Sequence, residues 1–379
     1  MKSGWVTKKL GEVCEALTSQ LRQKDLQPDS GEYPVYGASG FITKVGFYQS
    51  NTNCVGLVKD GAGVGRVMLL PPFSSVIGTM LMLVPRATIL NQYFYYLLVF
   101  LELGKDYSGA TIPHVYFKDF KDKDISLPPL AEQKRIVAKI DEAFEKIDAL
   151  KANAEKNLAN AKELFQSALD EAMRPKKGWV EKRLGEIGEY RKGPFGSALT
   201  KRIFVPKNAT TIKVYEQKNA IKKSATIGEY YITREYFNDK MTGFEVLPGD
   251  IIVSCAGTIG ETFVMPENME KGIINQALMR MRISPLVDKG YFLYYFDYVL
   301  KKSTNELSNG SALKNIPPFS VFKQLLISLP PIAEQKRIAK KLNDLLQKTK
   351  NLQQNYARQI ADCAEMRQAI LREAFEGRL

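Results

Sequence analysis

One stretch of the sequence occurs twice and decides the plan of the chain. Residues 127–140 read LPPLAEQKRIVAKI, and residues 329–342 read LPPIAEQKRIAKKL, 202 positions later. Each copy opens a run of about forty residues without proline and, until Gly377, without glycine. Such a run favours one uninterrupted helix behind each proline pair. At about 1.5 Å of rise per residue, we predict two rods of roughly 60 Å each.

A second repeat marks where the other segments begin. GWVTKKLGEV at 4–13 returns as GWVEKRLGEI at 178–187, 174 positions later, so the second globular segment is longer by 28 residues, the difference between 202 and 174. The sequence therefore predicts a tandem duplication of globular segment plus long helix, with approximate two-fold symmetry. The expected segments are a first domain at 1–126, a first spacer helix at 127–174, a second domain at 175–328 and a second spacer helix at 329–379.

Apolar residues in both helical runs recur every seven positions, which indicates a coiled coil. We predict an antiparallel pair, with its alanines facing Tyr356 and Leu352 and with one domain at each end of a dumbbell. The first run has one row of Ile140, Ile147, Ala154, Ala161 and Ala168 and a second of Ala143, Leu150 and Leu164; the second run has Leu342, Thr349, Tyr356, Cys363 and Ile370 beside Leu345, Leu352 and Met366.

Short apolar runs bounded by glycine or proline indicate strands in both globular segments. Because helices are also expected there, the fold class we predict is α+β, with two mixed α/β domains and two long helices. The expected strands are 53–59, 67–70 and 80–84, then 250–254 and 262–265; the expected helices are 91–103 and 290–300; glycine loops lie at 60–66 and 255–260.

The chain is basic, with a net charge of +13. Most of the excess lies in the globular segments, at +2 over 1–130 and +8 over 175–331, whereas 131–174 carries −1 and 332–379 carries +4. A basic globular surface favours a polyanionic partner such as nucleic acid. The alternative, that the charge serves only solubility, stays open at this point.

Few residues suggest catalysis. The four cysteines lie far apart and His114 is the only histidine, so neither a zinc site nor a nucleophile and base pair can be assembled. The glycine loop at 61–65 has no helix opening behind it, so it lacks a dinucleotide-binding context. Residues 316–319, Ile-Pro-Pro-Phe, resemble an amino-methyltransferase motif without its Asp or Asn. No apolar run could span a membrane, and we expect a cytoplasmic binding protein.

Several loops place Arg or Lys beside Tyr and Gly, and such cations bind phosphates and guanine edges. A single surface charge is usually an ordinary solvated residue, so the prediction concerns the loops as regions. The candidate DNA-binding residues are Tyr36, Lys44, Lys59, Arg66, His114 and Lys118 in the first domain, and Arg191, Lys192, Lys201, Arg202, Lys222, Lys223 and Lys314 in the second. The amides of Asn275 and Gln276 suit adenine.

The duplicated helix opening, the Gly-Trp-Val-x-Lys-x-Leu-Gly-Glu starts and the glycine loops at 59–67 and 256–260 together resemble the specificity subunit of type I restriction-modification enzymes. The resemblance implies two target recognition domains, each reading one half of a split DNA site, and helical spacers that set the gap. It implies no catalytic centre and no cofactor in this chain. It also implies two methyltransferase subunits, which use S-adenosylmethionine to methylate adenine, and restriction subunits, which use ATP and Mg.

Two other hypotheses remain at this stage. An enzyme that both reads DNA and transfers methyl groups would need a methyltransferase domain that the sequence lacks. A scaffold that joins proteins through its coiled coil, without reading bases, would not need the basic loops. Loss of salt-sensitive, sequence-selective binding after neutralising loops 59–66 and 191–202 would eliminate the scaffold.

Overall fold

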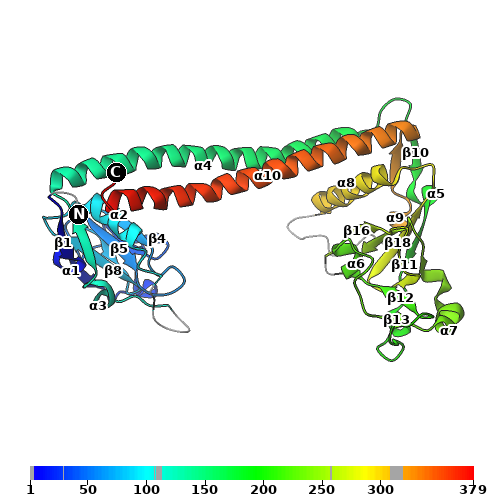
Figure 1. Cartoon of the computed structure of the whole chain (residues 1–379), viewed down its shortest axis with the longest axis horizontal. Coiled ribbons are helices and arrows are strands. Elements are labelled where there is room, and N and C mark those ends of the chain that lie inside the picture. Colours follow the sequence, from blue (N-terminus) through cyan, green and yellow to red (C-terminus); the bar gives the residue numbers. More distant parts are fainter. Residues whose placement is uncertain (1–3, 29, 106, 108–112, 257, 308–318) are drawn as a thin grey trace. The chain divides into compact units, whose positions relative to one another are not determined.

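The computed structural model describes residues 4–28, 30–105, 107, 113–256, 258–307 and 319–379 (Figure 1). The whole late loop predicted at 308–314, with Lys314, lies outside these described residues, as do residues 316–318 and residues 108–112 of the late loop predicted at 108–114. The chain divides into two compact units. The first unit holds residues 1–158 and 354–379, and the second unit holds residues 159–353.

The described residues of the first unit form three small sheets. A four-stranded antiparallel sheet has the order β2-β8-β5-β6, a three-stranded sheet has the order β4-β3-β7 with β3 and β7 parallel, and β1 pairs antiparallel with β9. The strands are β1 (Val6–Lys9), β2 (Cys14–Thr18), β3 (Tyr33–Gly37), β4 (Gly40–Val45), β5 (Cys54–Val58), β6 (Val67–Leu70), β7 (Ser75–Val76), β8 (Met80–Pro85) and β9 (Asp124–Leu127).

Strand β5 lies at the centre of this unit and is buried along its whole length. Its alternate side chains enter two different clusters, as the two-residue period of a strand requires. Val55 and Leu57 pack in the cluster that holds Phe94 and Leu97 of α2, whereas Val58 joins Met80 on the other side. The helices of the globular part are α1 (Leu10–Val13), α2 (Asn91–Leu101) and α3 (Phe117–Phe120).

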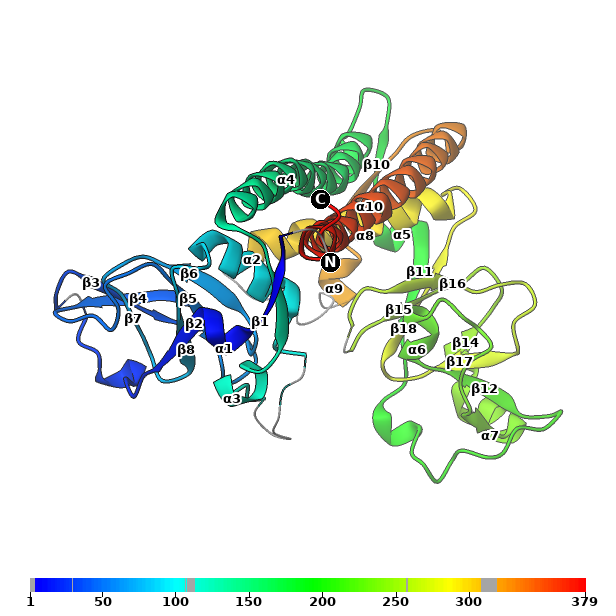
Figure 2. The same cartoon turned by 60° about the vertical axis from the view of Figure 1, so that its left-hand side comes forward.

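The second unit repeats this plan. Its main sheet has the order β11-β18-β15-β16, its second sheet has the order β13-β12-β17-β14 with β12 and β17 parallel, and β10 pairs with β19 (Figure 2). The strands are β10 (Val180–Arg183), β11 (Gly188–Lys192), β12 (Ile212–Tyr215), β13 (Tyr231–Ile232), β14 (Glu245–Val246), β15 (Ile251–Ser254), β16 (Thr262–Val264), β17 (Gly272–Ile274), β18 (Leu278–Ile283) and β19 (Leu326–Leu329). The helices are α5 (Leu184–Ile187), α6 (Gln217–Ile221), α7 (Arg234–Tyr236), α8 (Lys289–Leu307) and α9 (Phe319–Phe322).

The greater length of the second segment is concentrated in one interval. Strands β2 and β5 begin 40 residues apart, whereas β11 and β15 begin 63 residues apart. This interval therefore contains 23 of the 28 additional residues. It includes α6, α7 and the added edge strand β14, so the main sheet keeps its strand order.

The two long helices are α4 (Leu130–Met173) and α10 (Ile332–Phe375), of 44 residues each. In the first unit, the Arg135 guanidinium donates to the carbonyl of Leu379 at 2.8 Å, and Arg367 pairs with Asp148. Residues later in α4 therefore lie beside residues earlier in α10, so the two helices are antiparallel. Within the second unit the two helices also run in opposite directions (Figure 1).

The predicted α+β class and the antiparallel helix pairing are confirmed, and the first heptad row is buried at Ile140, Ile147, Ala154 and Ala161. The second row is wrong at four of its six positions, because Leu150, Leu164, Leu352 and Met366 are exposed, whereas Ala143 and Leu345 are half-buried. Leu352 therefore does not fill the seam as predicted. Among the positions four residues after the first row, Phe144 is buried, and Leu158, Phe165, Leu346 and Ile360 are half-buried. A helix of 3.6 residues per turn brings both spacings to one face, so the sequence pattern alone did not decide between them.

Candidate nucleic-acid interface

A buried glutamine joins each long helix to its globular part. Oε1 of Gln133 accepts from the Leu90 amide at 2.8 Å, and its Nε2 donates to two backbone carbonyls. Oε1 of Gln335 accepts in the same way from the Asp288 amide at 2.8 Å, and its Nε2 donates to the carbonyl of Pro330 at 2.9 Å. The repeated Ala-Glu-Gln therefore encodes an amide that ties the start of each long helix to the loop before α2 or α8.

The repeated Leu-Gly-Glu opening has a matching role. The Gly11 amide donates to the Lys121 carbonyl at 2.8 Å, and the Gly185 amide donates to the Lys323 carbonyl at 3.0 Å. A Cβ at Gly11 would lie 3.2 Å from the Cβ of Lys121, and one at Gly185 would lie 3.3 Å from that of Lys323, so the glycines allow this close approach. Each opening thereby positions the segment that follows α3 or α9.

In the first unit this scaffold brings together two candidate loops. The Gly61 amide donates to the Pro113 carbonyl at 3.0 Å, and the Val115 amide donates to the Lys59 carbonyl at 2.9 Å. Nδ1 of His114 lies 2.7 Å from a carboxylate oxygen of Asp60. The glycine loop and the late loop therefore form one surface. Lys59 itself is largely buried beside Asp60, which leaves its side chain less accessible than predicted.

Aromatic rings and two further cations complete this surface. The ring of His114 stacks on Tyr116 at a centroid distance of 5.9 Å, and Lys118 Nζ lies 5.4 Å from the centre of the Tyr116 ring. Arg66 Nη1 donates to the carbonyl of Ala38 in the β3–β4 turn at 3.1 Å. The structure thus brings Arg66, His114 and Lys118 to connected loops.

The two remaining candidates of the first unit lie on the β3–β4 hairpin. Tyr36 is half-buried on β3, where its ring meets that of the exposed Phe41 edge to face at 6.1 Å. Lys44 is exposed on β4. Phe41 was missed by the sequence analysis, although it follows directly on the glycine-rich turn at 37–40.

In the second unit, an open groove of about 610 Å³ lies at the end of β11. Arg191, Lys192 and Lys323 supply its cations, and no carboxylate is among the described residues that line it. The Arg191 guanidinium lies 4.7 Å above the ring of Phe244, and Gln276 lines the same groove. The groove therefore combines positive charge, an aromatic wall and an amide.

The other candidates of the second unit differ in their surroundings. Lys201, Arg202 and Lys222 are exposed. Lys223 is exposed as well, but its Nζ donates to Glu261 at 2.6 Å and to the carbonyl of Thr262 at 2.7 Å, and so bridges to the end of the glycine loop at 255–260. We interpret Lys223 as a residue that holds this loop.

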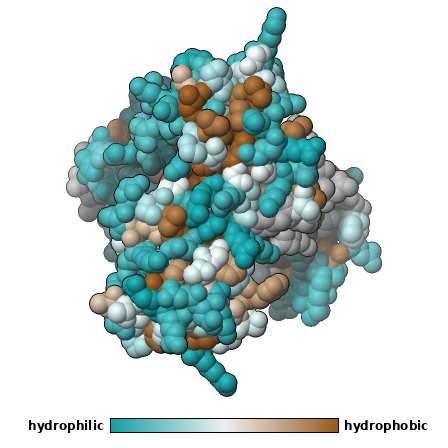
Figure 3. Space-filling model, turned by 90° about the vertical axis from the view of Figure 1, so that its right-hand side faces the viewer, coloured by the Kyte–Doolittle hydropathy of each residue, from teal (hydrophilic) through white to brown (hydrophobic). Residues whose placement is uncertain are grey.

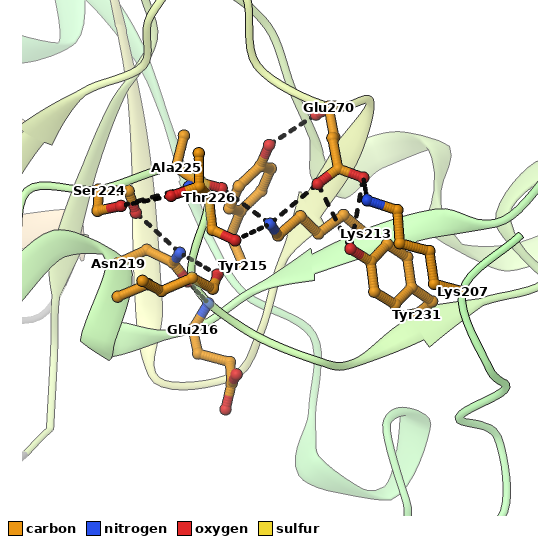
Figure 4. A network of polar contacts seen from close by, with 11 residues as sticks. Lys207, Lys213, Tyr215, Glu216, Asn219, Ser224, Ala225, Thr226, Tyr231 and Glu270 are labelled. Carbon is orange, nitrogen blue, oxygen red and sulfur yellow. Dashed lines mark hydrogen bonds and ion pairs between the residues drawn. The ribbon is translucent and has the colours of Figure 1, made fainter. Parts of the chain in front are cut away.

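A buried lysine supports the second sheet of this unit (Figure 4). Lys213 Nζ is fully buried and donates to the carbonyls of Ala225 and Thr226 at 2.9 and 3.0 Å and to Glu270 at 3.2 Å. Burial opposes the charge of Glu270, but hydrogen bonds from Lys207 and Lys213 outweigh it and lower the pKa of this carboxyl. The sequence analysis missed this network; its one signal was a lysine inside the apolar run 212–215.

The described residues contain no group of three His, Cys, Asp or Glu side chains that could hold a metal ion. Burial raises the pKa of the Cys14 thiol to about 12 and that of Cys255 to about 11, so neither is an activated nucleophile. No helix in the described part of the chain is long and apolar enough to cross a membrane.

Apolar side chains are exposed at equivalent positions of the two repeats. Each member of these pairs is between 40% and 57% exposed. The pairs are Val6 and Val180, 174 residues apart, and Leu130 and Ile332, Leu150 and Leu352, and Leu164 and Met366, 202 residues apart. Figure 3 shows hydrophobic residues gathered in separate patches on a mostly hydrophilic face.

Fold and surface define a duplicated α+β protein in which one repeated scaffold presents two unlike sets of cationic and aromatic loops. A model of the type I restriction modification DNA specificity domain matches residues 2–160 and again residues 176–360. The chain therefore belongs to this family, as a specificity subunit and not as an enzyme.

Two curated relatives come from Escherichia coli. The type I restriction enzyme EcoBI specificity subunit is 23% identical over 316 residues, which cover 76% of this chain and 66% of that protein's length. The EcoDI specificity subunit is 20% identical over 404 residues, covering 99% of this chain and 88% of the relative.

Two solved structures share the fold. One is a chain from a study of complex assembly and conformational transition in a type I R-M system, with a TM-score of 0.74, 21% identity and coverage of 100% of this chain and 99% of that one. The other is the HsdS subunit from Thermoanaerobacter tengcongensis, with a TM-score of 0.60, 22% identity and coverage of 100% and 98%.

Proposed function

We propose that the chain reads a bipartite DNA target, with one half-site bound by each globular part, and so directs adenine methylation and restriction by partner subunits. The observation that carries this proposal is that equivalent scaffolds, each tied by a buried glutamine, hold loops that differ in sequence, length and charge. A pure protein scaffold has no need for two unlike cationic surfaces. The thirteen predicted residues are our candidates for DNA contact, with Lys59 and Lys223 acting chiefly as supports.

The equivalent exposed apolar positions support two copies of one partner. Exposed apolar side chains that recur at the same place in both repeats suit a protein that docks twice in the same way. We assign this role to two methyltransferase subunits, with restriction subunits joining the complex. S-adenosylmethionine belongs to the methyltransferase partner, ATP and Mg belong to the restriction partner, and this chain acts in the cytoplasm without a cofactor of its own.

The test is methylome sequencing of cells that carry the complete system. Deleting seven residues from each long helix, at matched positions, changes the gap between the half-sites and leaves their bases unaltered, because half-site spacing follows protein geometry. Replacing residues 188–328 with those of a relative changes the bases of one half-site only. Altered bases with an unchanged gap after the helix deletion would overturn the spacer role, and unchanged bases after the replacement would favour the scaffold alternative.

A further inference from the structure

We propose that Phe195 is a wedge that enters a base step of the DNA half-site bound by the second unit and partly unstacks it. This inference rests on the proposed function and deepens it. Phe195 is 90% exposed, more than any other large hydrophobic side chain among the described residues. It lines the basic groove at the end of β11.

The backbone around Phe195 is fixed. The Gly193 amide donates to the Leu278 carbonyl at 2.9 Å, and a Cβ at Gly193 would lie 1.8 Å from the carbonyl oxygen of Asn275, so only glycine permits this contact. Pro194 is buried directly before Phe195 and Leu199 is buried shortly after it. The Ala198 amide donates to the Phe195 carbonyl at 2.9 Å, which opens a short 3-10 turn. An apolar ring is therefore held out between two buried anchors.

The equivalent residue of the first unit behaves differently. Leu21 lies 174 positions before Phe195, and its half-buried side chain packs against the cluster of Val35, Val45 and Ile77. The Leu21 carbonyl also accepts from the Gly78 amide at 2.8 Å. In the first unit, the same scaffold partly buries the side chain at this position. The shared fold therefore does not require that Phe195 be exposed.

Charge identifies the occupant of the groove. Three cations, Arg191, Lys192 and Lys323, line it beside Phe195, and its described lining holds no carboxylate. An apolar protein surface would leave these cations without counter-charges, whereas a DNA backbone supplies phosphates to them while its base steps accept the ring. Phenylalanine is one of the side chains that proteins insert between base steps, and the unstacking kinks the duplex.

The experiment uses the assembled complex of this chain with its methyltransferase subunits, on duplexes of the target found by methylome sequencing. 2-Aminopurine replaces one base at a time in the second half-site, except at the methylated adenine, since a methyltransferase extrudes that base itself. We expect 2-aminopurine at one base step to become fluorescent with the wild-type complex and to stay quenched with F195A. F195L should keep part of the signal, because leucine also acts as a wedge.

Affinity supplies the second measurement. F195A should bind the intact duplex about tenfold more weakly, and a mismatch at the fluorescent step should restore most of that loss, because the mismatch removes the cost of unstacking. On duplexes that carry 2-aminopurine in the first half-site instead, Leu21→Ala, at the equivalent position, should leave the fluorescence unchanged. Equal melting temperatures and equal assembly with the methyltransferase subunits verify that F195A is folded.

Each outcome decides the inference. Unchanged fluorescence and affinity in F195A, with specific binding by the wild type, would overturn the wedge alone. Loss of methyltransferase assembly in F195A, with normal unstacking by whatever complex forms, would make Phe195 a protein contact instead. Absence of sequence-selective binding by the wild-type complex would overturn the proposed function, a different result from either.

Discussion

The two halves of the chain agree in their interior and differ at their loops. Gln133 and Gln335 make equivalent hydrogen bonds, and β2-β8-β5-β6 has the same order as β11-β18-β15-β16. By contrast, the first unit buries part of Leu21 where the second exposes Phe195, and β12 carries a buried lysine network. The difference teaches that one set of internal contacts can hold two unlike surfaces, so scaffold and recognition vary independently.

The largest expected effect comes from disrupting the buried Lys213 network, which is a part of the second unit that differs from the first. Lys213→Met should lower the free energy of unfolding of that unit by about 3 kcal/mol, because it removes the buried donor to the carbonyls of Ala225 and Thr226 and one of the donors to Glu270. Urea unfolding followed by hydrogen exchange in residues 212–232 measures it. Lys207→Met is the matched control, since this lysine pairs with the same carboxylate from an exposed position. Equal losses in both variants would contradict the buried network.

The next prediction sharpens the agreement between the halves. Gln133→Ala and Gln335→Ala should each cost about 2 kcal/mol, because each removes the partners of several buried backbone groups. The two losses should be equal within error when each unit is followed by hydrogen exchange. Lys134→Ala, at the exposed neighbouring position, should change little. A loss of stability in only one half would show that the repeated glutamine stabilises that half alone.

A third prediction compares the two surfaces. Arg191→Gln with Lys192→Gln should weaken DNA binding by the assembled complex roughly tenfold and reduce the salt dependence by about one ion per residue. Arg66→Gln with Lys118→Gln should act more weakly, because the first segment carries less positive charge. Fluorescence anisotropy between low and moderate salt measures both, with Lys336→Gln as a control on the helix. Equal slopes for all three variants would rule out phosphate contacts at these loops.

The smallest expected effect is on the stability of the second unit at acidic pH. The folded pKa of Glu270 is lowered, so its contribution to stability is complete above its unfolded pKa and disappears as pH falls through the folded value. Glu270→Gln should therefore flatten the loss of stability of the second unit below about pH 4.5, while its amide oxygen still accepts from Lys213. The effect is small because the side chain is 39% exposed and solvent screens its charge. Thermal melting from pH 6 to pH 3 measures it, and parallel wild-type and mutant curves would contradict it.

The sequence predicted what repeats and periodicity determine. The prolines and the long glycine-free runs located both helices, and apolar runs between glycines located β5, β6, β8, β15 and β16 to within about two residues. Periodicity did not identify the second seam row, because residues three and four positions apart share one helix face. Nor did residue type separate Lys223, which pairs with Glu261, from its neighbour Lys222, since both are exposed lysines. That distinction depends on contacts between loops distant in sequence.

Most of the additional length of the second segment falls between β11 and β15, whereas the scaffold contacts of Gly185 and Gln335 lie outside that interval. The helix joint lies outside this stretch, whereas α6 within it packs on β15 and β16 of the main sheet and leaves the strand order of that sheet unchanged. Such a protein can acquire a new binding preference by mutation in a confined stretch while its assembly and folding continue to be inherited unchanged.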